Sequence, residues 1–244
     1  MTDHRPATAF LREPYAAAAL ARIEALLKAQ ATVWRTTLAS WKPDQLWGVP
    51  HVPQEEVGTM LRLPPLGMAD ETLPDEPEAK AWLSTARDLD HHIEQARNSN
   101  EPGALRRLED AFGLDATARD LLLFAFLPEL GQRYRRLLGY LMDDASQPWP
   151  NVELACRTLA LITDGPDVPR AALAETAPLR RHGLVELAAP AGLGEASPLS
   201  LRGLRIEPWV TVWLHGETSL PLELGSDAAL HAPADGKSLL SPAV

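Results

Sequence analysis

Apolar residues follow one another almost without interruption from Leu121 to Leu127, in a stretch that opens with a helix-start signal at Asp115. A helix that is apolar on every side belongs inside a domain rather than on its surface. After Pro128 the pattern becomes one-sided, with apolar residues at helical spacing and arginines between them. The pattern therefore predicts a buried helix pair over 113–144 as the centre of the core.

Two adjacent carboxylates, Asp143 and Asp144, close this predicted helix pair. Negative charges at the C-terminus of a helix oppose the helix dipole. Either the helix ends before these residues or they bind something, and the sequence alone leaves both interpretations open. Asp143 and Asp144 are therefore candidate partner-binding residues.

A second long pattern, from Tyr15 to about Trp41, predicts an amphipathic helix with Pro14 in its first turn. It contains neither Gly nor Pro, and its larger or apolar residues recur every three or four positions over roughly seven turns of ~3.6 residues. Helices this long pack lengthwise on a partner. The partner is either a second helix of the same chain, in an antiparallel hairpin, or another chain.

Prolines dominate residues 43–79, which we expect to form a connection with short helical turns around Gln54–Leu61. Helical composition returns at Glu78–Asn98, where Trp82, Ala86, Leu89 and Ile93 share one face. A short helix is predicted over Ala104–Phe112, ended by Gly113.

The pattern of residues 151–216 predicts three helices, a hairpin and a further helix. The helices begin at the capping residues Asn151, Asp167 and Thr176. The strands are predicted at Leu184–Leu187 and from Pro198–Arg202 onward, and a last helix begins at Pro208. A hairpin after a helix-turn-helix-like pair is typical of a winged-helix fold. The predicted fold is mainly α, with a helical N-terminal region (1–100), a winged-helix domain (101–216) and a flexible tail or linker (217–244).

Composition narrows the classes of function. The chain has 244 residues, a net charge of −10 and one cysteine. A nucleic-acid role would need a local basic face, since the overall charge repels phosphate. A single cysteine allows no intrachain disulfide, and no stretch resembles a signal peptide or a membrane span. We therefore expect a cytoplasmic protein that does not enter membranes.

No catalytic, cofactor-binding or metal-binding set is complete. The segment Ala234–Ser238 ends like a phosphate-binding loop, but His231 stands where that loop needs glycine. The acids and histidines over Asp88–Glu94 diverge around a helix and favour a solvated face. Cys156 lies in an apolar helix, which indicates an inert buried thiol. We therefore expect no enzymatic activity in this chain.

Basic residues gather on the second helix of the helix-turn-helix-like pair, where winged-helix proteins often contact DNA. They are Arg180, Arg181 and His182, with Arg170 nearby. These residues could contact phosphates or a protein. The acidic charge of the chain and the few basic residues near the predicted wing favour a protein. A DNA-binding regulator that uses Arg180 and Arg181 remains the alternative.

The amino-acid sequence of residues 105–215 resembles the N-terminal region of a family of bacterial AAA-type ATPases. The resemblance is carried by Gly113-Leu114, Ala118–Leu123, Pro128–Leu130, Arg133-Tyr134, Tyr140–Asp144 and Ala177–Val185. Members of that family carry a winged-helix domain ahead of the ATPase module and are often associated with contractile, phage-tail-like injection systems. The ATPase motifs would lie beyond Val244. The resemblance implies a non-catalytic adaptor that docks the ATPase to a particle component or cargo, or helps its ring assemble, and that could itself form homo-oligomers.

Overall fold

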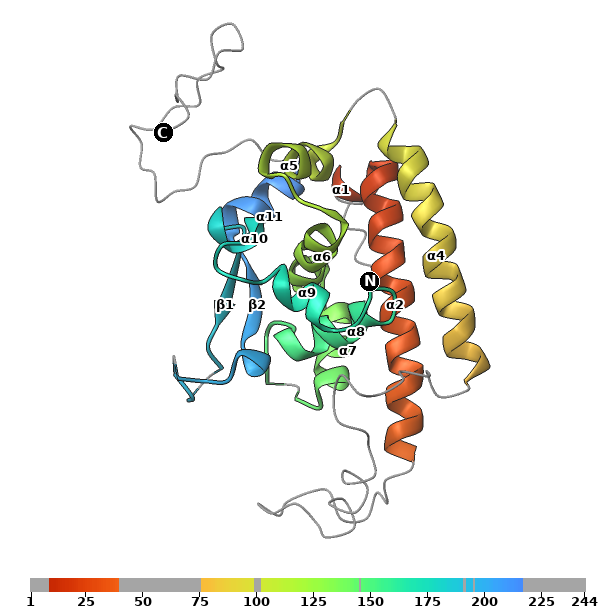
Figure 1. Ribbon diagram of the computed structural model, residues 1–244, viewed down its shortest axis with the longest axis vertical. Helices are drawn as coiled ribbons and strands as arrows, with labels where there is room; N and C mark the ends of the chain where they lie inside the picture. Colours follow the sequence, from red (N-terminus) through yellow and green to blue (C-terminus); the bar gives the residue numbers. More distant parts are fainter. Residues whose placement is uncertain are drawn as a thin grey trace, which may run out of the picture.

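The computed structural model describes residues 9–39, 76–98, 102–144, 146–190, 192–194 and 196–216. These residues form α-helices and one two-stranded antiparallel sheet (Figure 1). This arrangement confirms the mainly α class with a small hairpin. Most of the predicted proline-rich connection, the turns around Gln54–Leu61 and the tail from residue 217 lie outside the described residues.

An antiparallel helical hairpin forms the N-terminal part. Helix α1 (Ala9–Arg12) leads into α2 (Pro14–Ala39), and α4 (Pro77–Arg97) runs back along α2 (Figure 1). The predicted intrachain hairpin is confirmed. The connection that precedes α4 ends earlier than expected, because Pro77 occupies the first turn of α4, where a missing N–H leaves no hydrogen bond unmade.

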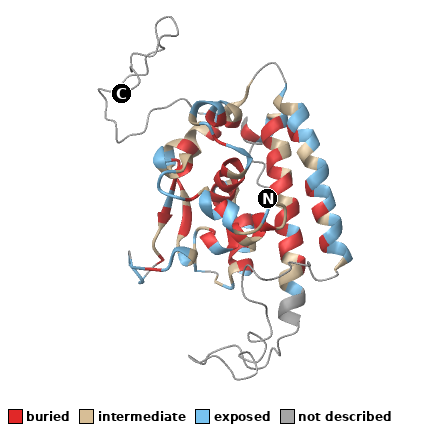
Figure 2. Ribbon diagram, in the orientation of Figure 1, coloured by how far each residue is buried: buried red, intermediate tan, exposed pale blue. Residues whose placement is uncertain are grey.

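Helix α6 (Ala116–Leu130) is the centre of the molecule. It follows α5 (Ala104–Phe112), and every residue from Ala118 to Pro128 is buried, as the red ribbon of Figure 2 shows. Asp115 caps its start by accepting a hydrogen bond from the backbone N–H of Ala118 at 2.7 Å. Both the buried helix and its cap are confirmed.

The break between the two central helices lies later than predicted. Helix α6 continues through Pro128 to Leu130, and Gly131, with φ 143°, separates it from α7 (Gln132–Met142). Proline lacks one backbone N–H and so disrupts a single bond of the ladder. Burial of α6 on all sides opposes that loss, so the helix ends where glycine allows a backbone conformation closed to other residues.

The C-terminal part has the order of elements that was predicted for a winged helix. The elements are α8 (Val152–Ala160), α9 (Asp167–Ala171), α10 (Pro178–Arg181), β1 (Val185–Ala188), the 3₁₀ turn η2 (Leu199–Leu201), β2 (Gly203–Ile206) and α11 (Pro208–Leu214). The register of the hairpin runs from Val185 opposite Ile206 to Ala188 opposite Gly203. Asn151 caps α8 as expected, accepting from the N–H of Leu154 at 2.8 Å.

Three local predictions are corrected. Residues Pro198–Arg202 do not begin the second strand, because β1 is four residues long and leaves no partner opposite them; Leu199–Leu201 instead form a 3₁₀ turn. Ala177 rather than Thr176 precedes α10, which begins with Pro178. Asp167 lies in the first turn of α9 and not at its cap.

A single hydrophobic cluster joins the helical hairpin to the winged-helix elements. It extends from Phe10 in α1 through Ile23 in α2 and Phe124 in α6 to Leu204 in β2 and Leu214 in α11. Phe10 meets Phe126 edge-on, with ring centroids 5.2 Å apart. Helix α2 is therefore part of the core on which the winged helix is built. Among the described residues, no helix is both long and apolar enough to cross a membrane.

Candidate protein-interaction surface

The basic residues predicted to contact a partner cluster around α10, but one of them is already engaged. Arg180 lies 3.7 Å from the carboxylate of Glu175 and donates a hydrogen bond to the backbone oxygen of Leu173 at 3.5 Å. Arg181 is exposed, and no ion pair reaches it within the described part of the chain. His182 is also exposed, and its ring packs on Phe112 with centroids 5.2 Å apart.

Arg170 is an exposed residue of α9 whose charge acts on Cys156 of α8. Burial raises the pKa of the Cys156 thiol to about 11, and the positive charge of Arg170 acts in the other direction. Cys156 is buried and free. The interpretation of this cysteine as an inert buried thiol agrees with these surroundings.

The wing, which comprises residues 189–202 between the two strands, carries little positive charge. Arg205 at its base pairs with Glu186 directly across the hairpin. Arg202 donates to the backbone oxygen of Ser197 at 3.4 Å. Among the described residues of the wing, the exposed large apolar side chains are Leu193, Leu199 and Leu201. An apolar wing is poorly suited to phosphate and better suited to protein.

Asp143 and Asp144 have local structural roles. Asp143 ends α7 in the left-handed conformation, with φ 53°, so the helix stops before the acids oppose its dipole. Asp144 accepts hydrogen bonds from the backbone N–H and the hydroxyl of Ser146, at 2.9 and 2.6 Å. The bond from the Ser146 side chain is the largest reason that the pKa of Asp144 is lowered.

The candidate residues therefore form two separate groups. Helix α10 precedes Val185, the first residue of β1, whereas the segment after α7 pairs with β2 through Asn151 and Gly203 at the opposite end of the sheet. The sequence did not indicate this separation. Arg180, Arg181 and His182 share one surface, and Asp143 and Asp144 lie elsewhere.

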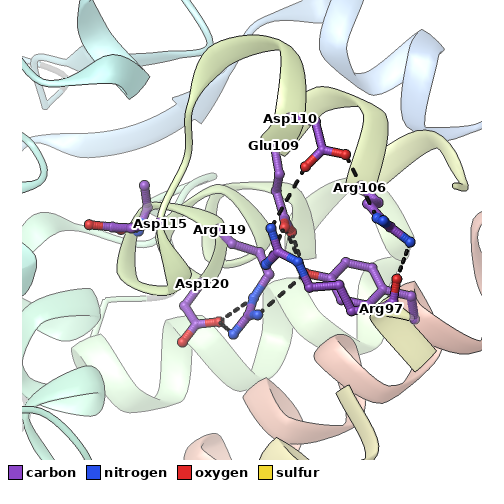
Figure 3. A network of polar contacts seen from close by, with 9 residues as sticks. Arg97, Arg106, Glu109, Asp110, Asp115, Arg119 and Asp120 are labelled. Carbon is purple, nitrogen blue, oxygen red and sulfur yellow. Dashed lines mark hydrogen bonds and ion pairs between the residues drawn. The ribbon is translucent and has the colours of Figure 1, made fainter. Parts of the chain in front are cut away.

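A buried polar network joins the hairpin to the body of the molecule (Figure 3). The hydroxyl of Tyr15 in α2 donates to the carboxylate of Glu109 in α5 at 2.7–2.8 Å. Arg119 in α6 pairs with Asp120 at 2.9 Å and approaches the Tyr15 hydroxyl at 3.5 Å. Arg97 in α4 reaches Glu109 at 3.5 Å. Glu109, Arg119 and Asp120 are only 2–3% exposed.

Arg22 extends this network along α2. It pairs with Asp120 and, at 2.5 Å, with Asp90 of α4, and it is itself buried. Two helices of the hairpin thus contribute charges that meet the charges of α5 and α6. Every buried charge in the network has an opposite partner, which is the condition under which burial of charge is tolerated.

Burial changes the proton affinities of the network. Desolvation raises the pKa of Glu109, although the bond from Tyr15 and the charge of Arg119 act in the other direction. Desolvation also raises the pKa of Tyr15 to about 12. Burial lowers the pKa of Arg119, but Asp120 and Tyr15 outweigh it and leave that pKa raised. At neutral pH, therefore, Arg119 is charged and Tyr15 keeps its proton.

Sequence reasoning missed this network as a structural feature. One signal was present, because Arg119 and Asp120 are two charged residues directly before an apolar run in a helix that the pattern placed inside the core. A charge inside a core needs a partner, so such a pair indicates a buried ion pair. The partners could not be identified, since Tyr15 and Arg22 lie far away in the sequence and Glu109, although near in sequence, lies on the separate helix α5.

The described residues offer no metal centre: nowhere in them do three His, Cys, Asp or Glu side chains approach closely enough to hold an ion. Asp88, His91, His92 and Glu94 lie exposed on α4. The His91 ring interacts with Gln95 at 2.8 Å. These four residues form a solvated helix face as expected, whereas Asp90 of the same cluster pairs with the buried Arg22.

Comparison with known proteins gives one match. Residues 13–225 match the family described as "Winged helix domain, variant". No curated protein and no solved structure matches the chain. The matched region begins at the start of α2 and extends past α11, so it includes the hairpin as well as the helix-turn-helix and the wing. The chain therefore belongs to the winged-helix domain, variant, family.

Proposed function

We propose that this chain is a non-catalytic protein-interaction module that serves as an adaptor of an AAA-type ATPase. It would dock the ATPase to a component or cargo of a contractile injection system, or aid assembly of the ATPase ring. Winged-helix domains in general bind nucleic acid or protein. The choice of protein as the partner rests on the charges of the surface described above.

One observation carries the proposal: Arg180 and Arg205, cations that a DNA-binding winged helix would turn toward phosphates, each pair with a glutamate on the same surface. The segment from Asp164 to Glu207 holds six acidic and five basic residues. Binding to DNA draws its affinity from phosphate neutralisation by many cations. With Arg180 and Arg205 paired to glutamates, Arg181 is the main cation left unpaired beside the wing among the described residues, and a single cation offers little of that affinity.

The link to an AAA-type ATPase rests on the resemblance of the sequence. The resembling segments fall in two stretches of the chain: 113–144, which holds α6 with Arg119-Asp120 and also α7, and Ala177–Val185, which forms α10 and leads into β1. The first belongs to the buried network and the second to the candidate surface. The resemblance thus covers both the buried core of the domain and its exposed candidate surface.

Electrophoretic mobility shift with duplex DNA separates the proposal from its alternative, a DNA-binding regulator that uses Arg180 and Arg181. We expect no shift at moderate salt. Tight, salt-sensitive binding that Arg180→Ala together with Arg181→Ala abolishes would refute the protein-binding function. The single variant Arg135→Ala is the matched control, because Arg135 is exposed on α7, away from α10.

Two further measurements address the adaptor role. The purified chain should show no ATP turnover, and turnover above that of a mock preparation would contradict the non-catalytic assignment. Co-expression with an AAA-type ATPase encoded in the same genome should yield a complex on size exclusion. Absence of a complex with every such ATPase, tested as full-length proteins, would contradict the association.

A further inference from the structure

An open pocket of about 440 Å³ lies between the start of α6, helix α9 and the start of α10. Its walls are mainly small or apolar, with Val168, Ala171 and Ala172 on one side and Ala177 and Pro178 on another. Helices packed through large side chains would fill such a space. Here the side chains of Ala171, Ala172 and Ala177 are too short to fill the space between the helices. The small residues at these three positions therefore leave the pocket open.

The mouth of the pocket exposes apolar surface. Val168 is 40% exposed and is one of the few large apolar side chains of the described residues that face solvent to this extent. Exposed apolar residues that border a hollow mark sites of contact with other molecules. The volume lies within the roughly 300–1,000 Å³ range of binding pockets, and a hollow with few polar groups accepts an apolar group.

The charge at the pocket is negative. Asp115 is the one charged residue that lines it, and Figure 3 shows its side chain turned away from the Arg119–Asp120 pair. Arg180, on α10, does not line the pocket and is engaged by Glu175 and by the backbone oxygen of Leu173. Because Asp115 is exposed, a cation beside an apolar anchor would be attracted to it.

We propose that this α6–α9–α10 pocket holds one large apolar side chain of a protein partner, carried on a segment with a lysine or arginine next to that anchor. The inference rests on the proposed protein-binding function and assigns its contact site. It places the centre of contact in the pocket rather than on Arg180, Arg181 and His182, which do not line it. The carboxylate of Asp115 at the rim disfavours a phosphate group as the occupant.

Filling the pocket is the direct test. Ala172→Trp places a bulky side chain into the pocket from its wall. Ala174→Trp is the matched control, because Ala174 is exposed two residues away and does not line the pocket. Asp115→Asn removes the charge but keeps the helix cap, since asparagine and aspartate are equally good caps. Circular dichroism and thermal unfolding confirm that each variant is folded.

The probe is a displayed library of random linear peptides, selected on the full immobilised chain and then measured singly by fluorescence anisotropy. We expect selected peptides to share a large apolar residue next to Lys or Arg. Their affinity should fall about tenfold or more with Ala172→Trp, which removes a buried anchor. It should fall about two- to fivefold with Asp115→Asn and stay unchanged with Ala174→Trp.

The failures are distinguishable. No enriched peptide, or peptides that bind Ala172→Trp as well as the unchanged chain, would overturn the pocket proposal. Self-association of the chain that Ala172→Trp abolishes in sedimentation would make a second copy the occupant and also overturn it. An ATPase complex that forms with Ala172→Trp would leave the adaptor function standing without the pocket. Arginine-dependent DNA binding in the mobility shift would refute the proposed function itself.

Discussion

Replacing Tyr15 with phenylalanine tests whether the buried network stabilises the fold. The substitution removes one oxygen atom and leaves the ring of Tyr15, which is 4% exposed, in the core. Glu109 then loses the hydroxyl that donates to its carboxylate at 2.7–2.8 Å and keeps only Arg97, at 3.5 Å. A hydrogen bond to a buried charge is worth about 1.5–3 kcal/mol, so we expect Tyr15→Phe to lower the free energy of unfolding by about that amount.

Urea unfolding at pH 8, followed by the fluorescence of the seven tryptophans, measures this loss. The corresponding fall in Tm for a domain of this size is about 3–12 °C. Tyr140→Phe is the control, because Tyr140 is 44% exposed, and it should change the free energy of unfolding by less than about 0.5 kcal/mol.

A double-mutant cycle assigns the effect to the contact with Glu109. In a Glu109→Met background the acceptor is absent, so Tyr15→Phe should cost little further stability. If Tyr15→Phe costs the same in both backgrounds, the hydrogen bond does not account for the loss. If Tyr15→Phe alone lowers the free energy of unfolding by less than about 0.5 kcal/mol, the network stabilises the fold no more than apolar packing would. That result would refute the prediction.

Three further predictions concern other groups. Burial raises the pKa of Glu109 above 4.5, so over the pH range between its unfolded and folded pKa the folded state holds a proton that the unfolded state has lost. The free energy of unfolding therefore falls as pH rises through that range. In urea unfolding measured at a series of pH values, Glu109→Gln should not show this fall. Asp115→Ala removes the cap of α6 and should cost about 1 kcal/mol in the same assay, whereas Asp115→Asn should not. Cys156 is buried with a pKa of about 11, so an aromatic disulfide reagent at pH 8 should label it at an appreciable rate only in denaturant; fast labelling of the folded chain would contradict its burial.

The sequence predicted the elements whose signals are local. The apolar run from Leu121 to Leu127 identified the central helix, and Asp115 and Asn151 marked helix starts that the structure confirms. Those signals succeed because a cap bonds to an N–H three residues away, and because a helix with apolar residues on all sides has to be buried. Gly113, with φ 64°, ends α5 as predicted for the same local reason.

Predictions failed where a local sequence pattern was compatible with more than one local structure. The alternation in Pro198–Arg202 resembles a strand, but a strand exists only where another is paired with it, and β1 ends at Ala188. Pro128 resembles a helix end, but packing of α6 on all sides allows the helix to continue to Leu130. In both places the decision depended on residues distant in the sequence.

The sequence by itself determined the helix starts, the buried central helix, the order of elements that makes a winged helix, and the residue types available at its surface. Each of these depends on contacts within a few residues of the chain. Only the tertiary structure decided which charges and polar groups pair with one another. Arg180 and Arg205 are paired with glutamates, and Tyr15 meets Glu109 across 94 positions of the chain. Such partners are fixed by the packing of α2 and α4 on the body, because an ion pair or hydrogen bond requires contact in space and leaves no periodic signal in the sequence.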